Sequence, residues 1–195
     1  MSTLKVIIAS TRPGRIGLPI GTWITEVARR HGGVDRVEVL DLATIDLPMF
    51  DEPHHPRLRQ YVHPHTQAWS AAVDEADAFV IVSPEYNFSF TGALKNALDY
   101  LSQEWAYKPV GLVTYGGISG GTRAAHAIRQ VASVLKMVPV PEAVALPMVF
   151  PQVVDGEFVP TAANEQAAGV MLDEIAKLEG ALAPLRQPAV ASTPA

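Results

Sequence analysis

The stretch from Phe79 to Leu101 reads FVIVSPEYNFSFTGALKNALDYL and decides the fold. It begins with an apolar run that contains Val80, Ile81 and Val82. β-Branched residues without polar alternation are typical of a strand buried on both faces of a parallel sheet. A polar and aromatic segment follows, and apolar residues then recur at helical spacing from Leu94 onward. The stretch therefore predicts a strand, a loop and a helix, with the loop at the edge where open α/β sheets bind ligands.

Two other predicted strands end in loops of similar character. Residues 4–9 are mostly apolar and lead into STRPGRIG at 10–17, after which a helical pattern begins. Residues 110–115, VGLVTY, are predicted to form another buried strand and lead into the glycine-rich GGISGGTR at 116–123. Glycines allow positive φ and let the backbone approach a flat ligand closely, although a flexible turn would have the same composition.

Strands are also predicted over 37–42 and around 143–146, and helical patterns separate the strands. Five strands alternating with five helices predict an α/β fold, a three-layer αβα sandwich around a parallel sheet. In the flavodoxin-like strand order 2-1-3-4-5, the three loops would lie along one edge. Residues 1–183 are predicted to form one domain, residues 43–62 an irregular loop, and Pro184 to Ala195 a tail.

Composition limits the classes of function. The chain has 195 residues, 48% of them hydrophobic, and shows neither a signal peptide nor a membrane-spanning run, so we expect a cytoplasmic protein. It has no cysteine, so redox chemistry must come from a bound cofactor. The net charge of −5 argues against a nucleic-acid surface, and an anionic ligand would need a local basic site.

Such a site is predicted at the first loop. The unpaired N–H groups at a helix N-terminus attract anions, and Ser10, Thr11, Arg12 and Arg15 precede one here. Capping and turn geometry alone would also explain these residues. The loop has neither the P-loop ending nor the dinucleotide G-x-G-x-x-G spacing, so we interpret Asp41 as a cap or turn residue and not as a ribose ligand.

The histidines could suggest a metal site. They lie in a proline-rich segment and just after it, without a carboxylate or cysteine at a recognised ligand spacing. We interpret them as surface residues, and no metal site is predicted. They are His54, His55, His63 and His65.

The central stretch resembles a known family, the NADPH-dependent FMN reductases, which are flavodoxin-like and include quinone, azo-dye and chromate reductases. The residues SPEYNFSFTGALKNALD at 83–99 look like the family signature P-E-Y-N-x-S-x-P-G-x-L-K-N-A-x-D. Thr91 replaces the usual proline and is expected to cap the following helix. Residues 10–15 resemble the family's phosphate loop, and residues 115–124 resemble its glycine-rich flavin loop.

The resemblance implies that FMN binds at these loops and that NADPH or NADH donates electrons. The flavin performs the chemistry, so no side chain need be an acid, a base or a nucleophile. Arg123 and Lys95 could reach the nicotinamide cofactor's phosphates but are interpreted as solvated helix residues. The implied cofactor-binding residues are Ser10, Thr11, Arg12, Arg15, Ile16 and Gly17 for the phosphate, and Pro84, Glu85, Tyr86, Asn87, Phe88, Tyr115, Gly116, Gly117 and Ser119 for the ring.

The resemblance also implies ping-pong transfer to a small oxidant such as a quinone, an azo compound, a free flavin or a metal oxyanion. Family members are homodimers or homotetramers with the flavin near the subunit boundary, where Met49 and Phe50 could form part of a neighbour's wall. Two alternatives remain: a flavodoxin-like electron carrier that does not react with NAD(P)H, and a non-catalytic flavin-binding sensor or interaction protein. The sequence does not select the physiological acceptor or NADPH over NADH.

Overall fold

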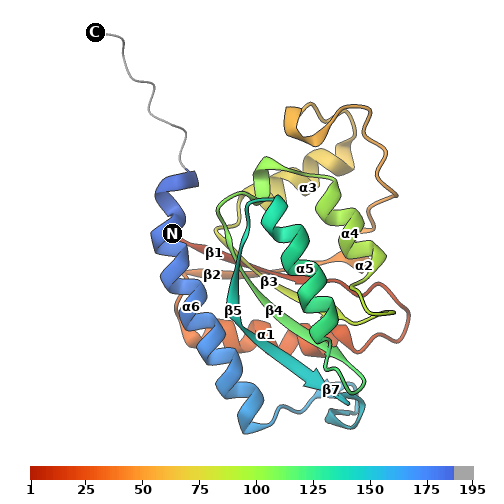
Figure 1. The fold of residues 1–195 in the computed structure, drawn as a ribbon, viewed down its shortest axis with the longest axis vertical. Helices are drawn as coiled ribbons and strands as arrows, with labels where there is room; N and C mark the ends of the chain where they lie inside the picture. Colours follow the sequence, from red (N-terminus) through yellow and green to blue (C-terminus); the bar gives the residue numbers. More distant parts are fainter. Residues whose placement is uncertain (187–195) are drawn as a thin grey trace.

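The computed structural model describes residues 1–186 and forms an α/β fold (Figure 1). Residues 187–195, which include most of the predicted tail, lie outside the described residues. The strands are β1 Thr3–Ile8, β2 Arg36–Asp41, β3 Ala78–Pro84, β4 Pro109–Gly116, β5 Val138–Pro147, β6 Val153–Val154 and β7 Glu157–Phe158. The helices are α1 Gly17–His31, α2 Leu42–Ile45, α3 Pro64–Asp74, α4 Gly92–Asp99, α5 Thr122–Val134 and α6 Ala162–Arg186, with short 3-10 turns η1 Pro56–Leu58, η2 Gln103–Trp105 and η3 Phe150–Gln152.

The main sheet is five-stranded and has the order β2-β1-β3-β4-β5, which confirms the predicted 2-1-3-4-5 topology. All four neighbouring pairs in it are parallel. Because parallel strands share a direction, the carboxyl ends of β1, β3 and β4 are neighbours at one edge. The topology therefore brings together the three loops that the sequence singled out.

Both faces of the three central strands β1, β3 and β4 are buried, as their apolar runs predict. Val80 and Val82 of β3 pack with α1 and α6 on one face, whereas Phe79 and Ile81 pack with α3, α4 and α5 on the other. Successive side chains of a strand point to opposite faces, so one strand supplies both cores. Figure 1 shows the resulting three layers.

The ends of the elements follow local chemistry. Gly32 ends α1 in the left-handed conformation with φ 69°. The Thr91 hydroxyl accepts a hydrogen bond of 3.1 Å from the Leu94 N–H, which confirms the predicted cap of α4. The same hydroxyl donates to the carbonyl oxygen of Ala9 at 2.9 Å, so Thr91 also fastens α4 to the end of β1.

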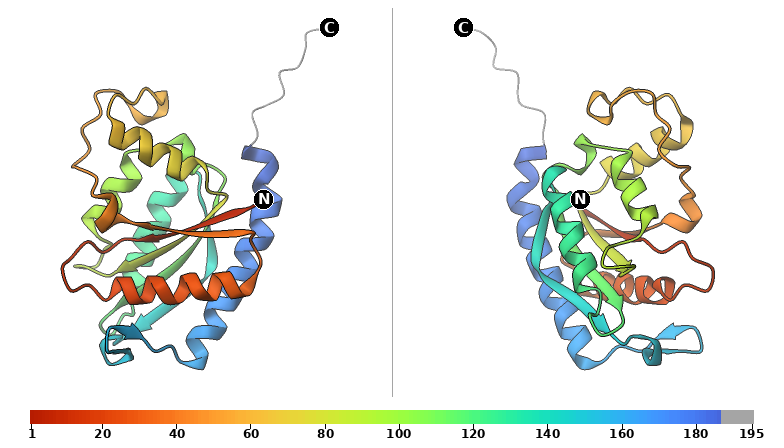
Figure 2. Two further views of the ribbon diagram at one scale, coloured as in Figure 1. Left: turned by 180° about the vertical axis from the view of Figure 1, so that it is seen from behind. Right: turned by 45° about the vertical axis from the view of Figure 1, so that its right-hand side comes forward.

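Some elements differ from the prediction. The segment expected to be irregular contains one turn of helix in α2 and the 3-10 turn η1 (Figure 2). β5 is longer than predicted and includes Pro139 and Pro141, which an edge strand tolerates because one of its sides has no hydrogen-bonding neighbour. The β6–β7 hairpin was not predicted.

Helix α6 continues through Pro184 to Arg186, so the start of the predicted tail is helical. Its end is held to the sheet, because the Arg186 guanidinium pairs with Asp77 at 3.2 Å and donates to the Tyr107 carbonyl oxygen, also at 3.2 Å.

Candidate flavin site at the sheet edge

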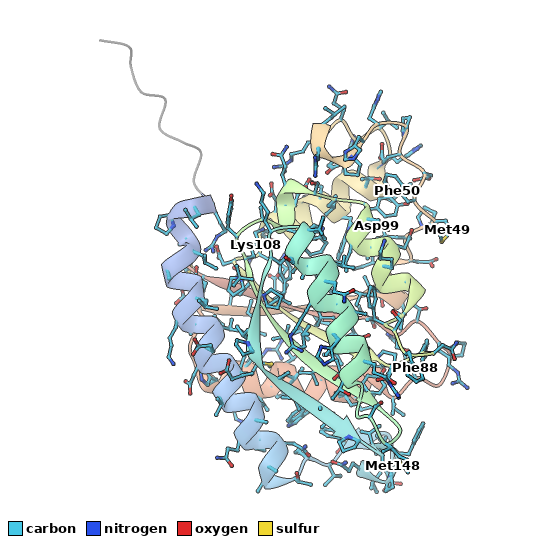
Figure 3. The ribbon with its side chains drawn as sticks, in the orientation of Figure 1. Met49, Phe50, Phe88, Asp99, Lys108 and Met148 are labelled. Carbon is cyan, nitrogen blue, oxygen red and sulfur yellow. The ribbon has the colours of Figure 1, made fainter. Side chains whose placement is uncertain are left out.

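Three loops meet where β1, β3 and β4 end. The Oγ of Ser10 lies 3.5 Å from the hydroxyl of Tyr86, which joins the first loop to the second. The N–H of Glu85 donates a hydrogen bond of 2.9 Å to the carbonyl oxygen of Tyr115, which joins the second loop to the third. Figure 3 shows Phe88 of the second loop at this end of the sheet. The loops therefore form one continuous edge.

The first loop presents an unusual helix N-terminus. Ile16 is the N-cap of α1 and supplies no side-chain cap, and the first turn of α1 has no acidic residue. The N–H groups of a first turn lack helical acceptors and carry partial positive charge. Thr11 and Arg12 are exposed beside it. This donor set fits a phosphate group.

Arg15 is held by a neighbour in the fold. Its guanidinium forms two hydrogen bonds with the carboxylate of Asp41, both 2.5 Å long, and it also donates to the Ser10 carbonyl oxygen at 2.7 Å. Burial alone would raise the pKa of Asp41, but the hydrogen bonds from Arg15 and from the Ala43 N–H hold it below its ordinary value. Asp41 is the N-cap of α2, which confirms its interpretation as a cap. The charge of Arg15 is thus already paired.

The second loop contains a tight turn with two residues in the left-handed region. The N–H and carbonyl groups of Tyr86 and Ser89 exchange hydrogen bonds of 2.8 and 2.9 Å. Asn87 and Phe88 between them have φ values of 49° and 71°. Asn87 tolerates this conformation, as expected, whereas an aromatic residue rarely adopts it. The turn leaves the Phe88 side chain 70% exposed.

Glu85 connects the second loop to the third. Its carboxylate, whose side chain is only 6% exposed, accepts hydrogen bonds from the Ser119 hydroxyl at 2.9 Å and from the Arg123 N–H at 3.1 Å, and it also pairs with the Arg123 guanidinium. Burial alone would raise the pKa of Glu85, but these donors hold it below its ordinary value. Arg123 is therefore not simply a solvated helix residue.

Arg123 also covers an aromatic ring. The centre of its guanidinium lies 3.8 Å from the centroid of the Phe88 ring, in a cation–π contact. Arg123 thus links the two loops twice, through the Glu85 carboxylate and through Phe88. Sequence reasoning missed this contact because the partners are far apart in the chain and meet only through the pairing of β3 with β4.

The glycine-rich loop lies close to the end of β4. Gly121 has φ 83°, and a Cβ there would lie 2.6 Å from the Tyr115 nitrogen. Gly117, in contrast, has nothing within 4 Å of an added Cβ. The backbone is therefore tight against β4 at one end and open at Gly117, which suits the approach of a flat ring.

Tyr115 lies behind this edge. It is 4% exposed and belongs to the core between the sheet and α1, and burial raises the pKa of its hydroxyl. A Cβ at Gly17 would lie 2.5 Å from the Tyr115 hydroxyl oxygen, so a larger residue at the start of α1 would force the buried Tyr115 side chain to shift. Tyr115 therefore shapes the site from behind.

A cavity of about 270 Å³ adjoins the first loop. Thr11 is the only one of its lining residues that was predicted to contact the cofactor. The segment 46–50 closes one side and is fixed to α4, because Asn96 donates to the Pro48 carbonyl oxygen at 2.7 Å and accepts from the Phe50 N–H at 2.9 Å. The remaining lining residues are Leu42, Asp46, Leu47, Met49, Gly92, Ala93 and Ala97.

The histidine segment lies apart from the three loops. His65 donates to the Asp51 carboxylate at 3.0 Å and stacks on His63, with ring centroids 5.1 Å apart. Within residues 1–186, no group of three or more His, Cys, Asp or Glu side chains is placed to hold a metal ion. Nor does that part of the chain contain a helix with the length and apolar character needed to cross a bilayer.

The predicted cofactor-binding residues all lie in these three adjoining segments, at different depths. Thr11, Arg12, Tyr86, Asn87, Phe88 and Gly117 are exposed, whereas Arg15, Ile16, Glu85, Gly116 and Ser119 are half-buried. Ser10, Gly17, Pro84 and Tyr115 are buried. The exposed members could touch a ligand through side chains, and the buried ones shape the edge.

Comparisons of the sequence with known proteins identify the family of the chain. Residues 3–150 match the family model described as NADPH-dependent FMN reductase. An NAD(P)H-dependent FMN reductase of Schizosaccharomyces pombe is 40% identical over 155 residues, 78% of this chain and 76% of that protein. A quinone reductase of Escherichia coli is 33% identical over 132 residues, 64% of this chain and 66% of that protein.

Solved structures give the same fold. The flavoenzyme FerB of Paracoccus denitrificans, an NAD(P)H:(acceptor) oxidoreductase, superposes with a TM-score of 0.71 at 19% identity. The match covers 93% of this chain and 98% of that chain.

Proposed function

Because the chain belongs to the NADPH-dependent FMN reductase family, we propose that FMN binds across the three loops at the carboxyl edge of β1, β3 and β4. The protein is an FMN-dependent NAD(P)H oxidoreductase that acts on small molecules. One observation carries the placement of the cofactor: the N-terminus of α1 has no side-chain cap and no acidic residue, and Arg12 is exposed next to it. Such a terminus is suited to a phosphate.

The residues of the first loop divide into two roles. Arg12 and the N–H groups of the first turn of α1 are available to hold the FMN phosphate. Arg15 is paired with Asp41 and bound to the Ser10 carbonyl oxygen, so it fixes the shape of the loop. We therefore assign direct phosphate binding to Arg12 and a positioning role to Arg15.

The second and third loops frame the space for the ring. The turn that carries Tyr86 and Phe88 forms one wall, and the open backbone at Gly117 forms the opposite wall. Hydrogen bonds between Glu85 and Arg123 join the second loop to the start of α5. Bound FMN would supply the chemistry, accepting a hydride from NAD(P)H and passing electrons to an acceptor.

The acceptor, assembly and location are parts of the same proposal. We propose a small acceptor such as a quinone, an azo compound, a free flavin or a metal oxyanion, with NAD(P)H and the acceptor entering in turn. Met49 and Phe50 are 80% and 39% exposed beside the cavity that adjoins the first loop, which supports a homodimer or homotetramer with the flavin near the subunit boundary. We also propose that the protein is cytoplasmic.

Anaerobic spectroscopy tests this function. Purified protein loaded with FMN is mixed with NADPH or NADH, and the flavin absorbance is followed before and after a quinone is added. Rapid bleaching, followed by recovery of the colour on addition of the quinone, is the expected result. Indifference of the bound flavin to both nicotinamides would favour an electron carrier or a non-catalytic flavin-binding protein, and failure to bind FMN would contradict the proposal.

A pair of variants tests the placement. Arg12→Ala should weaken FMN binding by about tenfold or more, because hydrogen bonds to charged groups contribute about 1.5–3 kcal/mol. Arg29→Ala removes an exposed arginine from the other end of α1 and serves as the control. Equal FMN affinities in the two variants, measured by quenching of flavin fluorescence, would contradict the placement.

A further inference from the structure

A larger cavity lies at the opposite edge of the sheet. It has a volume of about 890 Å³ and is lined by the ends of α3, α5 and α6, by η1 and η2, and by the residues that precede β4. Figure 3 shows Lys108, one of its lining residues, near the start of β4 and away from Phe88. The cavity is therefore separate from the flavin site.

Every carboxylate that lines the cavity has a basic partner. Asp74 pairs with Arg59 at 2.5 Å, and Glu104 lies 3.3 Å from the same guanidinium. Asp77 pairs with Arg186 at 3.2 Å. Two arginines thus serve these three carboxylates, and Arg186 also pairs with Glu179 at 2.7 Å, so the positive surplus at the cavity comes from its other basic residues.

Three basic side chains remain. Lys108 is buried and donates to the carbonyl oxygens of Val73 and Asp74 at 2.8 and 3.0 Å, and burial lowers its pKa to about 8. Arg57 and Lys136 are exposed at the cavity. In the described part of the chain, none of the three forms an ion pair with a carboxylate. Five basic and three acidic residues line the cavity, whereas the chain as a whole carries a net charge of −5.

The wall also offers apolar and aromatic surface. Tyr107, Val134, Leu135 and Leu185 contribute to it, and the Lys136 ammonium lies 5.5 Å from the centroid of the Tyr107 ring. Tyr107 has φ 61°, and its N–H donates to the Lys136 carbonyl oxygen at 2.8 Å. A tyrosine in the left-handed region is strained, and strain of this kind is often retained at binding sites.

We propose that this cavity binds a phosphorylated organic anion of nucleotide size, with its phosphate groups against the exposed Arg57 and Lys136 and its organic part against the apolar wall, while the buried Lys108 adds positive charge nearby. Sites for small ligands commonly enclose about 300–1,000 Å³ and combine apolar walls with a few charged groups. An arginine fork suits phosphate oxygens, and lysines add point charge. The flavin edge takes no part in this site.

Calorimetric titration of FMN-saturated full-length protein tests the proposal. ADP is the probe, adenosine is the uncharged comparison, and citrate is a carboxylate anion of similar charge. ADP should bind, and adenosine should bind at least about tenfold more weakly because it lacks the phosphates. Absence of ADP binding would overturn the proposal, and citrate binding as tightly as ADP would overturn the assignment to phosphate.

A double variant locates the binding. Arg57→Gln with Lys136→Gln should weaken ADP binding by at least about tenfold and leave FMN affinity and NADPH oxidation unchanged. Lys177→Gln, which removes an exposed lysine outside the cavity, should bind ADP like the parent protein. Both positions of the double variant are exposed, so the fold should be retained, which circular dichroism verifies. ADP binding that survives in the double variant would place the nucleotide elsewhere and overturn the proposal.

Discussion

The pairing of Arg15 with Asp41 makes a sharp prediction about the first loop. The two side chains are only 14% and 15% exposed, and two hydrogen bonds of 2.5 Å join them. Removing one partner of a buried pair leaves an uncompensated charge and costs about 3–5 kcal/mol when burial is complete. Because this pair retains some contact with water, we expect Arg15→Ala to lower the free energy of unfolding by about 2–4 kcal/mol.

Asp41→Ala and the double variant complete the cycle. Asp41→Ala should be destabilising too, since it removes the pair and the cap of α2. The double variant removes both charges, so its loss should be smaller than the sum of the single losses by about 1–3 kcal/mol. Urea unfolding of the FMN-free protein at pH 7 measures all four free energies. Additive losses would show that the pair contributes no coupling.

The pH dependence follows from the lowered pKa of Asp41. A carboxyl with a lower pKa in the folded state stabilises the fold at pH values above its unfolded pKa, and this contribution is lost as the pH falls through the folded value. The difference between the parent protein and Asp41→Ala should therefore stay constant from about pH 8 to pH 5 and shrink below about pH 4. A difference that instead changes near pH 6 to 7 would assign the effect to another group.

FMN affinity separates a positioning role from direct phosphate binding. If Arg15 acts through its pair, Arg15→Ala and Asp41→Ala should weaken FMN binding to similar extents, because each destroys the same contact. If Arg15 bound the phosphate, Asp41→Ala would free the guanidinium and leave FMN binding intact or tighter. The second pattern, measured by flavin fluorescence, would refute the assignment of Arg15 as a positioning residue.

Three further variants test other parts of the edge. Gly17→Ala should lower the free energy of unfolding by about 1–3 kcal/mol, because the new Cβ would lie 2.5 Å from the hydroxyl of the buried Tyr115. Gly92→Ala is the control, since a Cβ at Gly92 has nothing within 4 Å, and it should be near neutral in the same urea unfolding assay. Thr91→Ala should lose about 1 kcal/mol in thermal unfolding through loss of the α4 cap, and Thr91→Ser should recover most of it. Glu85→Gln should lower the free energy of unfolding by about 1–2 kcal/mol at pH 7. Because the pKa of Glu85 is lowered in the fold, this loss should shrink below about pH 4. A loss that does not change with pH would exclude the ion pair with Arg123 as its cause.

The sequence predicts the sheet order because its signals are local and mutually consistent. Apolar runs mark strands buried on both faces, and right-handed crossovers then leave few arrangements of those strands. The cap at Thr91 and the left-handed Asn87 are also local, since each depends on the chemistry of one residue and its neighbours. The elements missed, such as α2 and the β6–β7 hairpin, are short and carry weak periodicity.

The partners of the charged side chains are harder to predict. Arg15 meets Asp41 because β1 and β2 are adjacent, and Glu85 meets Arg123 because β3 and β4 are adjacent. The sequence shows which side chains are charged, but which charged side chains form ion pairs depends on how the strands are arranged in the fold. The prediction therefore placed Arg15 and Arg12 in one role, whereas the structure pairs Arg15 and leaves Arg12 exposed.

Strand β4 connects the two edges. Lys108 precedes it at the cavity, and Tyr115 lies near its other end behind the flavin edge. Coupling between distant sites is commonly carried by an element with two alternative arrangements, whereas β4 is a buried central strand paired on both sides. A ligand in the cavity should thus stabilise the fold by mass action and leave the affinity for FMN unchanged. Binding at both edges is therefore expected to be additive, because the strand between them is buried and paired on both sides.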